Sequence, residues 1–197
     1  MEALEAILTR RSTRNYRPDP VEEEKLNRIL DAARQAPSGG NSQTCHFLVI
    51  RSREVLRRLI EMTEKAFSAM EATESTYASL RHAIAASKKG GYVFCYNAPL
   101  LIVAANRRDY GNNIADCACA IENMMIAANA LDLGSCWINQ LRWLNEEPAI
   151  VRFLTELGMR EDERVYGAVI IGYPAAGDGL PARHLMPQKG NEVTLID

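Results

Sequence analysis

The sequence has little net charge and no long apolar run, and each shortage excludes a class of protein. The formal net charge is −2 and the pI is about 6.0, so the basic stripe of a nucleic-acid-binding domain is missing. No apolar run approaches the length of a membrane-spanning helix, so no membrane span is expected. The N-terminal MEALEAILTRR has early acidic residues and no apolar core, which is not the pattern of a signal peptide.

Histidine is also scarce, and the cysteines follow no framework. Five cysteines are an odd number without disulfide spacing, which predicts a reducing, cytoplasmic environment. His46, His82 and His184 show no paired spacing, and Cys117 and Cys119 would point apart on a helix, so no metal site is expected. We interpret the cysteines as small buried hydrophobic residues. The GxSxG, GxGxxG and GxxxxGK[ST] signatures are absent, which argues against a hydrolase elbow, a Rossmann fingerprint and a P-loop.

The remaining pattern is that of a globular chain with alternating helices and strands. Apolar residues make up 47% of the 197 positions and charged residues 24%, which is enough for a core without staples. Without repeats or a dividing linker, residues 1–197 are expected to form a single domain. Helices are predicted over 2–11, from an N-cap at Asp19-Pro20 to Pro37, and over 53–70, 113–133 and 146–157, with strands over 46–51, 99–105, 134–139 and 165–173.

Two stretches do not fit this alternation. The periodicity becomes unclear through 73–91, and we predict that about 67–96 is a variable excursion or lid. The tail, 174–197, contains three prolines and few apolar residues before VTLI at 193–196. It cannot form a core of its own, so it is expected to pack on something else.

The densest cationic segment is RRSTR at 10–14. Three guanidinium groups and hydroxyl groups within five residues make a set of donors suited to one anion, such as a phosphate. A solvated basic end of the preceding helix is the alternative, because cations are favourable near a helix C-terminus.

Two glycine-containing segments provide further candidates. PSGGNSQ at 37–43 allows close backbone approach to a flat ligand and offers both donors and acceptors, although a simple turn also fits. LGSCWI at 133–138 either presents backbone N–H groups at a helix-to-strand turn or is a plain helix cap before a strand.

Taken together, these segments resemble the FMN-dependent nitroreductase family. The shared motifs are, in order, RRSTRNY, APSGGNSQ, NAPLLIV, LDLGSCWI and GAVIIGYP, and the resemblance runs from about residue 5 to residue 190. It implies an α+β fold with a central, mainly antiparallel sheet flanked by helices, in an intertwined homodimer whose C-terminal extension, 174–197, wraps the partner. TCHF after the glycine loop departs from the PWHF or PWRF that is common in the family, at the wall of the flavin pocket.

The resemblance also implies three groups of FMN-binding residues. The phosphate, ribityl and pyrimidine group is Arg10, Arg11, Ser12, Arg14 and Arg183. The loop that reaches the flavin from the other subunit holds Pro37, Ser38, Gly39 and Asn41, and the backbone donors near flavin N5 are Gly134 and Ser135. For Asn97, Gln43 and Lys189 a flavin contact stays open.

The implied activity is reduction of nitroaromatics, quinones or similar small acceptors with NAD(P)H, by ping-pong hydride transfer through FMN. No side chain is then needed as a catalytic acid or base, and Arg14, followed by Arg10, is expected to stabilise charge at the pyrimidine edge. The aromatic residues of 67–96 either shape the acceptor pocket or pack in the core. Two alternatives are a non-catalytic FMN carrier or redox sensor, and a non-flavin dimer that binds another anion.

Overall fold

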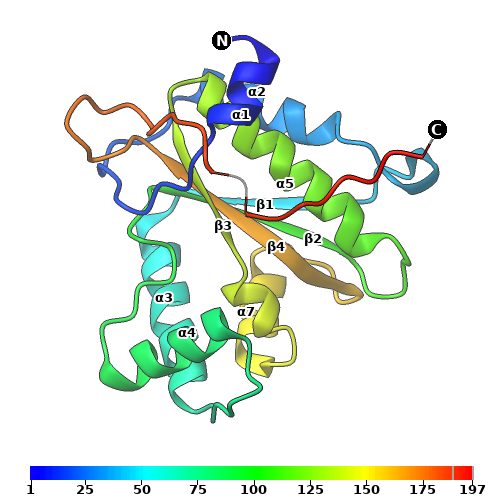
Figure 1. Cartoon of the computed structure of the whole chain (residues 1–197). Coiled ribbons are helices and arrows are strands. Elements are labelled where there is room, and N and C mark those ends of the chain that lie inside the picture. The colour runs from blue at the N-terminus through cyan, green and yellow to red at the C-terminus, as the bar shows by residue number, and fades with distance from the viewer. Residues whose placement is uncertain (188, 197) are drawn as a thin grey trace.

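A four-stranded antiparallel sheet forms the centre of the fold, in the order β1-β2-β4-β3 (Figure 1). The structure is a computed structural model that describes residues 1–187 and 189–196. The strands are His46–Ile50 (β1), Leu100–Arg107 (β2), Gly134–Ile138 (β3) and Glu163–Gly172 (β4). The helices are Ala3–Thr9 (α1), Glu23–Arg34 (α2), Arg53–Ser68 (α3), Ala78–Lys89 (α4), Asn113–Ala130 (α5), Gln140–Trp143 (α6) and Pro148–Glu156 (α7), with a 3-10 turn at Gly39–Asn41.

The central strand β2 explains the long apolar run in the sequence. Alternate residues of a strand point to opposite faces, and both faces of β2 are covered. Leu100 and Ile102 pack with α2 and α5, whereas Leu101 and Val103 pack with α3, α4, α6 and α7. All four side chains are fully buried, which is the pattern expected for a strand between two helical layers.

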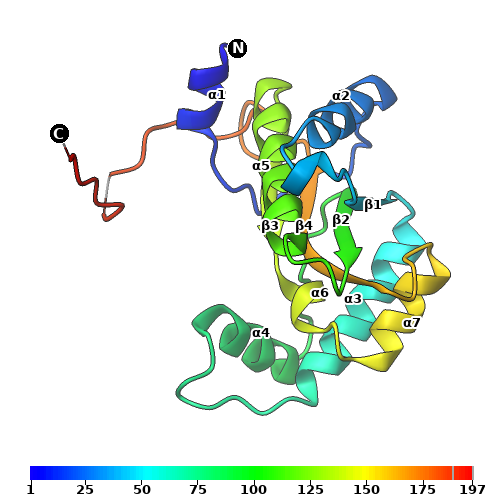
Figure 2. The ribbon, with the colours of Figure 1, turned by 90° about the vertical axis from the view of Figure 1, so that its right-hand side faces the viewer.

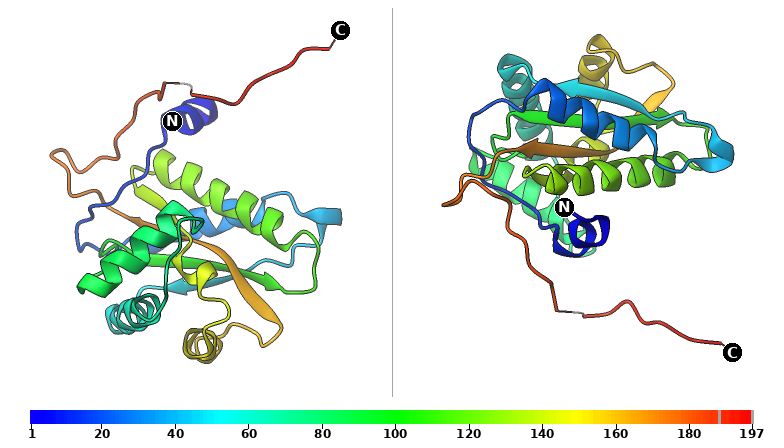
Figure 3. Two further views of the ribbon diagram at one scale, coloured as in Figure 1. Left: turned by 60° about the horizontal axis from the view of Figure 1, so that its bottom comes forward. Right: turned by 90° about the horizontal axis from the view of Figure 1, so that it is seen from above.

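The helices therefore form two layers on either side of the sheet (Figures 2 and 3). α5 lies across one face beside α2, and the short α1 packs on the outer side of α5. This arrangement confirms the predicted α+β class with a central antiparallel sheet. Because α1 contributes only Ala6 to the core, its Leu4, Ile7 and Leu8 remain exposed.

Two predicted helices have different bounds in the structure, and α4 and α6 were not predicted. α2 begins at Glu23, not at Asp19-Pro20, because the Asp19 carboxylate pairs with Arg17 at 3.2 Å instead of capping a helix. The unclear stretch 73–91 contains α4, in which Ala83 and Ile84 are buried against the core. The predicted helix over 146–157 is shorter, as α7, and follows the additional α6.

The buried carboxylate of Glu163 joins β1, β4 and the turn before β4 at one end of the sheet. It contacts Nδ1 of His46 on β1 at 2.7 Å, and it accepts hydrogen bonds from the backbone and the guanidinium of Arg160, each at 2.9 Å. Burial alone would raise the pKa of Glu163, but His46 and Arg160 hold that pKa below its ordinary value. The carboxylate is therefore kept charged and fixes the first residue of β1 against the first residue of β4.

The C-terminal segment leaves the body of the molecule after Arg183, whose side chain still contacts Asn129 and Asp132 (Figure 3). Among the described residues beyond Pro174 there is no helix or strand. Its large apolar side chains are exposed: Leu185, Met186, Val193, Leu195 and Ile196. Within residues 1–187 and 189–196, no helix has the length and apolar character needed to cross a membrane.

Candidate functional site

The arginine segment 10–14 lies beside the first residues of β3. Helix α1 ends at Thr9, and the backbone of Arg10 turns to an extended conformation. Ser12 then forms a parallel bridge with Ser135, and the N–H of Thr13 donates to the Ser135 carbonyl at 2.9 Å. An extended segment projects its side chains in alternating directions, which a continued helix would not do.

Gly134 is required for this close approach. A Cβ atom at Gly134 would lie 2.5 Å from Oγ1 and 2.7 Å from Cβ of Thr13. Only glycine leaves room for the 10–14 segment to lie against the β3 backbone. The glycine of the LGSCWI motif therefore does more than end a helix, because it sets the distance between two of the predicted FMN-binding segments.

The three guanidinium groups have different partners. Arg10 faces Glu122 of α5 at 3.8 Å and is half-buried, whereas Arg14 is exposed. Arg11 bonds to the carbonyls of Arg10 and Leu8 at the end of α1. Arg11 therefore acts as the cation at the C-terminus of α1, which was the alternative interpretation of this segment. Arg14 is exposed and is accessible to a ligand.

Cys136 of β3 and Tyr16 are two titratable side chains close to the arginine segment. Burial raises the pKa of the Cys136 thiol, and Arg14, Ser12 and Arg10 act in the opposite direction. Burial likewise raises the pKa of the Tyr16 phenol, which donates to the Thr13 carbonyl at 2.7 Å. The cations therefore face a wall whose thiol and phenol stay neutral.

Two polar atoms at this place are buried and lack a hydrogen-bond partner among the described residues. They are Oγ of Ser135 and Nε of Arg11. Unpaired buried polar atoms are costly, so such groups in a native protein usually await a ligand or water. Ser135, which is 1% exposed, and Arg11 are both among the predicted FMN-binding residues.

Arg183 lies near the same end of the molecule but is already engaged. Its Nε donates to the Asn129 side chain at 3.2 Å, and its Nη2 donates to Asp132 at 2.6 Å, beside the C-terminus of α5. Asn129 is buried and in turn donates to the Ala6 carbonyl of α1. Arg183 therefore ties the tail to α5 and α1, and Asp132 offsets its charge.

The second predicted group, in the loop 37–43, is held by α5 at its other end. The N–H of Gly39 donates to the buried carboxylate of Asp116 at 3.1 Å, and the Tyr110 hydroxyl donates to both the Gly39 carbonyl and Asp116. Ser38 accepts from the backbone of Gln43 at 3.0 Å, which closes the turn. Pro37 and Asn41 are exposed at its surface. The loop is thus an ordered structure rather than a plain turn.

Asp116 and Tyr110 were not found by sequence reasoning. Asp116 belongs to the first turn of the long apolar helix, where a charged residue stands among buried neighbours. That pattern was a usable signal, because a buried carboxylate is nearly always paired. Its partners at 38–42 lie more than 70 positions away in the chain, so the sequence did not identify them.

The predicted groups contact α5 at different positions. The loop is attached at Asp116, Arg10 faces Glu122, and Arg183 and the end of α1 are attached at Asn129. Asp116 is six residues from Glu122 and thirteen from Asn129, which corresponds to about 9 Å and about 20 Å along the α5 axis. The open candidates lie elsewhere: Gln43 in the loop, Asn97 in a pocket with Pro18 and Arg53, and Lys189 exposed in the tail.

Comparisons with known proteins give a consistent result. The sequence model described as the nitroreductase family matches residues 7–173. A protein of Archaeoglobus fulgidus, provisionally named as an NADH dehydrogenase/NAD(P)H nitroreductase, is 33% identical over 174 residues, which are 88% of this chain and 86% of that protein.

Solved structures have the same fold. The crystal structure of a nitroreductase with bound FMN from Bacteroides fragilis is 36% identical, covers all of both chains and superposes with a TM-score of 0.85. A second FMN-bound nitroreductase, from Desulfitobacterium hafniense, shares the fold over the full length of both chains, with a TM-score of 0.80 at 24% identity.

Proposed function

Because this chain belongs to the nitroreductase family, we propose that it is an FMN-dependent oxidoreductase that uses NAD(P)H to reduce nitroaromatics, quinones or similar small acceptors. The observation that carries the proposal is the cluster formed by 10–14 and 134–135. It combines an exposed cation, a backbone cradle that excludes a Cβ atom, and two buried polar atoms without partners. The FMN-bound relative at 36% identity supports the same cofactor for this cluster.

The residues present fit FMN. Arg10, Ser12 and Arg14 offer cationic and hydroxyl donors of the kind that bind a phosphate and the pyrimidine edge of a flavin. The unpaired Ser135 hydroxyl and Arg11 Nε would gain hydrogen-bond partners. Binding would then remove the free-energy penalty of two buried polar atoms without partners.

FMN, when bound, supplies the hydride chemistry between the nicotinamide and the acceptor. The protein contributes position and charge. Arg14 would hold the pyrimidine edge of FMN with a permanent positive charge, and Arg10, partly neutralised by Glu122, would add a weaker one. The neighbouring Cys136 and Tyr16 stay protonated and so add no opposing charge. No side-chain acid or base is needed, and we assign none.

We further propose that each FMN site is shared between two chains. Arg10 faces α5 at Glu122 and the loop is held at Asp116, about 9 Å away along the helix axis. Pro37 and Asn41 are exposed at the surface of this loop, which supports a site completed by Pro37, Ser38, Gly39 and Asn41 of a second copy. Exposed apolar residues of α1 and of the tail, 174–197, are the matching surface for a homodimer. The five free thiols agree with the predicted cytoplasmic location.

The first test is the visible spectrum of the purified protein before and after anaerobic addition of NADH or NADPH. A yellow protein that bleaches is expected. Yellow protein that neither donor bleaches would instead indicate the carrier or sensor, and colourless protein that rejects added FMN would contradict the assignment of the arginine segment.

Sharing of the site is tested by complementation between two defective chains. Arg14→Ala and the double variant Ser38→Ala/Asn41→Ala each damage one half of the site, so both homodimers should lose FMN. In a mixture that is dissociated and reassociated, half of the dimers combine one chain of each kind, and about a quarter of the sites are intact. Failure of the mixture to recover FMN binding above either parent would show that each site belongs to one chain.

A further inference from the structure

We propose that Cys45 and Cys117 form an oxidisable dithiol that a hydroperoxide converts to an intramolecular disulfide. Cys45 lies just before β1 and Cys117 lies on α5, and their Sγ atoms are 3.7 Å apart. A disulfide requires about 2.05 Å, so the two sulfur atoms must approach by less than about 2 Å. The other three cysteines, Cys95, Cys119 and Cys136, have no cysteine sulfur bonded to them among the described residues.

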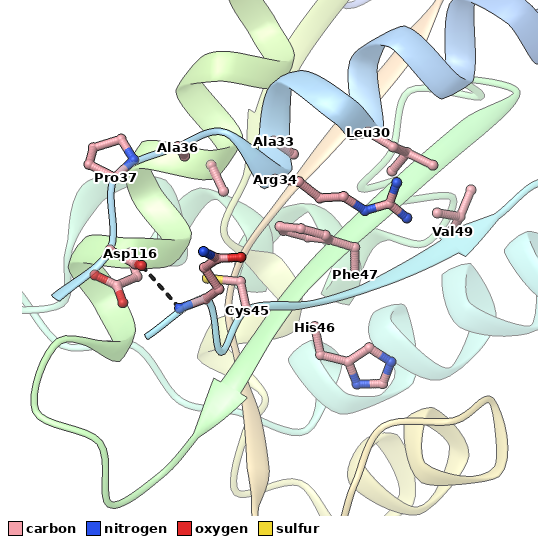
Figure 4. A pocket seen from close by; sticks show the side chains of 13 residues that line it. Leu30, Ala33, Arg34, Ala36, Pro37, Cys45, His46, Phe47, Val49 and Asp116 are labelled. Carbon is pink, nitrogen blue, oxygen red and sulfur yellow. Dashed lines mark hydrogen bonds between the residues drawn. The ribbon is translucent and has the colours of Figure 1, made fainter. Parts of the chain in front are cut away.

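The two thiols differ in access. Cys45 is half-buried and lies in the wall of a cavity of about 440 Å³, with Pro37 and Asp116 on one side and Phe47 on the other (Figure 4). Cys117 is fully buried behind it. A small oxidant therefore reaches Cys45 first, while Cys117 is protected and can react only with Cys45.

Their hydrogen bonds give them different roles. The bond with Cys117 lowers the pKa of Cys45 although partial burial and the Asp116 carboxylate act against it, and the Asn106 amide, which donates to the Cys45 sulfur at 3.7 Å, lowers that pKa further. The same contact with Cys45, together with burial, raises the pKa of Cys117. Cys45 is thus the thiolate that attacks, because thiolates and not thiols are the nucleophiles.

The chemistry is balanced with a hydroperoxide as the oxidant. The Cys45 thiolate attacks one peroxide oxygen, the O–O bond breaks, and an alcohol, or water from hydrogen peroxide, leaves as Cys45 becomes a sulfenic acid. The Cys117 sulfur then attacks the Cys45 sulfur, the S–O bond breaks, and water leaves with the Cys117 proton. The two thiols together lose two electrons and two protons, which the peroxide accepts.

The disulfide would connect the residue just after the loop 37–43 to the part of α5 that holds this loop. Cys45 follows this loop in the chain, and Cys117 follows Asp116, which holds Gly39. Drawing the two sulfur atoms together shifts these anchors relative to one another. This consequence rests on the proposed function, because it assumes that the loop completes a flavin site. We therefore expect oxidation to weaken FMN retention by at least about tenfold and a dithiol reductant to restore it.

The test uses the FMN-loaded protein, treated with increasing hydrogen peroxide, alkylated under denaturing conditions and digested without reduction. The expected result is a cross-linked peptide pair containing Cys45 and Cys117 that a dithiol reductant separates. Cys119→Ser is the matched control, because Cys119 lies on the same helix and should not change the yield. In Cys117→Ser, Cys45 should accumulate as a sulfenic acid that dimedone traps, and Cys45→Ser should form no cross-link.

Three outcomes would contradict the proposed disulfide. Cys45 could be oxidised to a sulfinic acid without a cross-link, or it could be cross-linked to a different cysteine. Both thiols could also resist oxidation at doses that oxidise Cys119. FMN release, followed separately by flavin fluorescence, tests the consequence. A cross-link that leaves FMN bound overturns the coupling to the loop. Protein that never binds FMN overturns the proposed function, and the peptide analysis still decides the dithiol.

Discussion

Among single residues, Arg14 combines exposure with a position at the centre of the predicted site. Its neighbours Arg10 and Arg11 are partly satisfied by Glu122 and by backbone carbonyls, so Arg14 is the cation with the most to gain from a bound anion. This difference could not be obtained from the sequence RRSTR, in which the three arginines look equivalent. It arises because α1 ends at Thr9 and Arg11 folds back onto the last carbonyls of the helix.

Arg14→Ala is expected to weaken FMN binding by about 1.5–3 kcal/mol, the contribution of a hydrogen bond to a charged group. Fluorescence titration of the apoprotein with FMN measures the change. Arg57→Ala, which removes an exposed arginine from α3, is the matched control and should leave the affinity unchanged. Equal affinities for the wild type and Arg14→Ala would remove Arg14 from the site.

Ser135 allows a sharper test, because its hydroxyl is buried and unpaired. Replacing it with alanine removes an unsatisfied group, so the apoprotein should become no less stable. The same change should weaken FMN binding by about 0.5–1.5 kcal/mol if the hydroxyl bonds the cofactor. Thermal unfolding without FMN and titration with FMN separate the two effects, and a loss of apoprotein stability with unchanged FMN affinity would assign Ser135 a purely structural role.

At the scale of elements, the strands and the starts of α3 and α5 were predicted well, whereas the start of α2 was misplaced and α4 was not predicted. β2 was identified from its continuous apolar run, which is the pattern of a strand buried on both faces, and the structure shows that burial. The other strands were identified from similar short apolar runs. Asp19 was expected to cap α2, but a carboxylate can bond a nearby guanidinium instead, and Arg17 is two residues away. The loop 37–43 was recognised by its composition, whereas its anchors at Asp116 and Tyr110 depend on tertiary contacts that no local pattern contains.

The contact between 10–14 and β3 predicts the effect of adding a side chain at Gly134. Gly134→Ala should destabilise the protein by about 1–3 kcal/mol, as overpacking usually does, and should displace the arginine segment. Chemical denaturation gives the stability, and FMN titration gives the affinity. Gly177→Ala is the control, because a Cβ atom there meets no other atom within 4 Å. A Gly134→Ala protein with wild-type stability would contradict the close packing.

The ion pair between β1 and β4 predicts a pH dependence of stability. The pKa of Glu163 is lowered in the folded state, so the unfolded chain binds more protons as the pH falls below the ordinary value of 4.5. The stabilisation is therefore complete above that pH and is lost as the pH falls through the folded pKa. Glu163→Gln should cost about 1–3 kcal/mol at pH 7, the penalty for breaking hydrogen bonds to a buried charged group.

Urea unfolding from pH 7 to pH 3 checks this expectation. The difference between wild type and Glu163→Gln should narrow in the acid range. Glu161→Gln, an exposed neighbour, should follow the wild type throughout. A difference that stays constant from pH 7 to pH 3 would show that the Glu163 charge does not contribute.

For the whole molecule, the exposed apolar side chains of the tail lead us to expect that they contribute to dimerisation. Leu195→Asp should weaken dimerisation by about 1.5–3 kcal/mol, which is the value of burying one leucine side chain. Sedimentation across a range of concentrations measures the dissociation constant. Glu192→Gln, a charge change in the same exposed segment, should not affect it. A Leu195→Asp protein that dimerises like the wild type would exclude this part of the tail from the interface.

The sequence patterns predicted the elements within one chain but not the contacts between two chains. The motifs at 10–14, 37–43 and 133–138 were identified as separate candidates, but their spacing in the chain does not say that α5 contacts two of them, at Asp116 and at Glu122. A contact supplied by a second chain leaves no local periodicity in the sequence. For that reason, only the family resemblance indicated a shared site.

The position of β1 has a consequence for how this chain is handled in the cell. β1 pairs with β2 alone, so among the described residues its outer edge has no strand beside it. Such an edge is a template for any extended chain, and this molecule has one in the segment after Arg183. If two copies each place this segment beside the β1 strand of the other, they would form a closed dimer. If each copy places it beside β1 of a different molecule, an open-ended filament would form. An uncovered β1 edge is therefore a liability for polymerisation when the protein is concentrated.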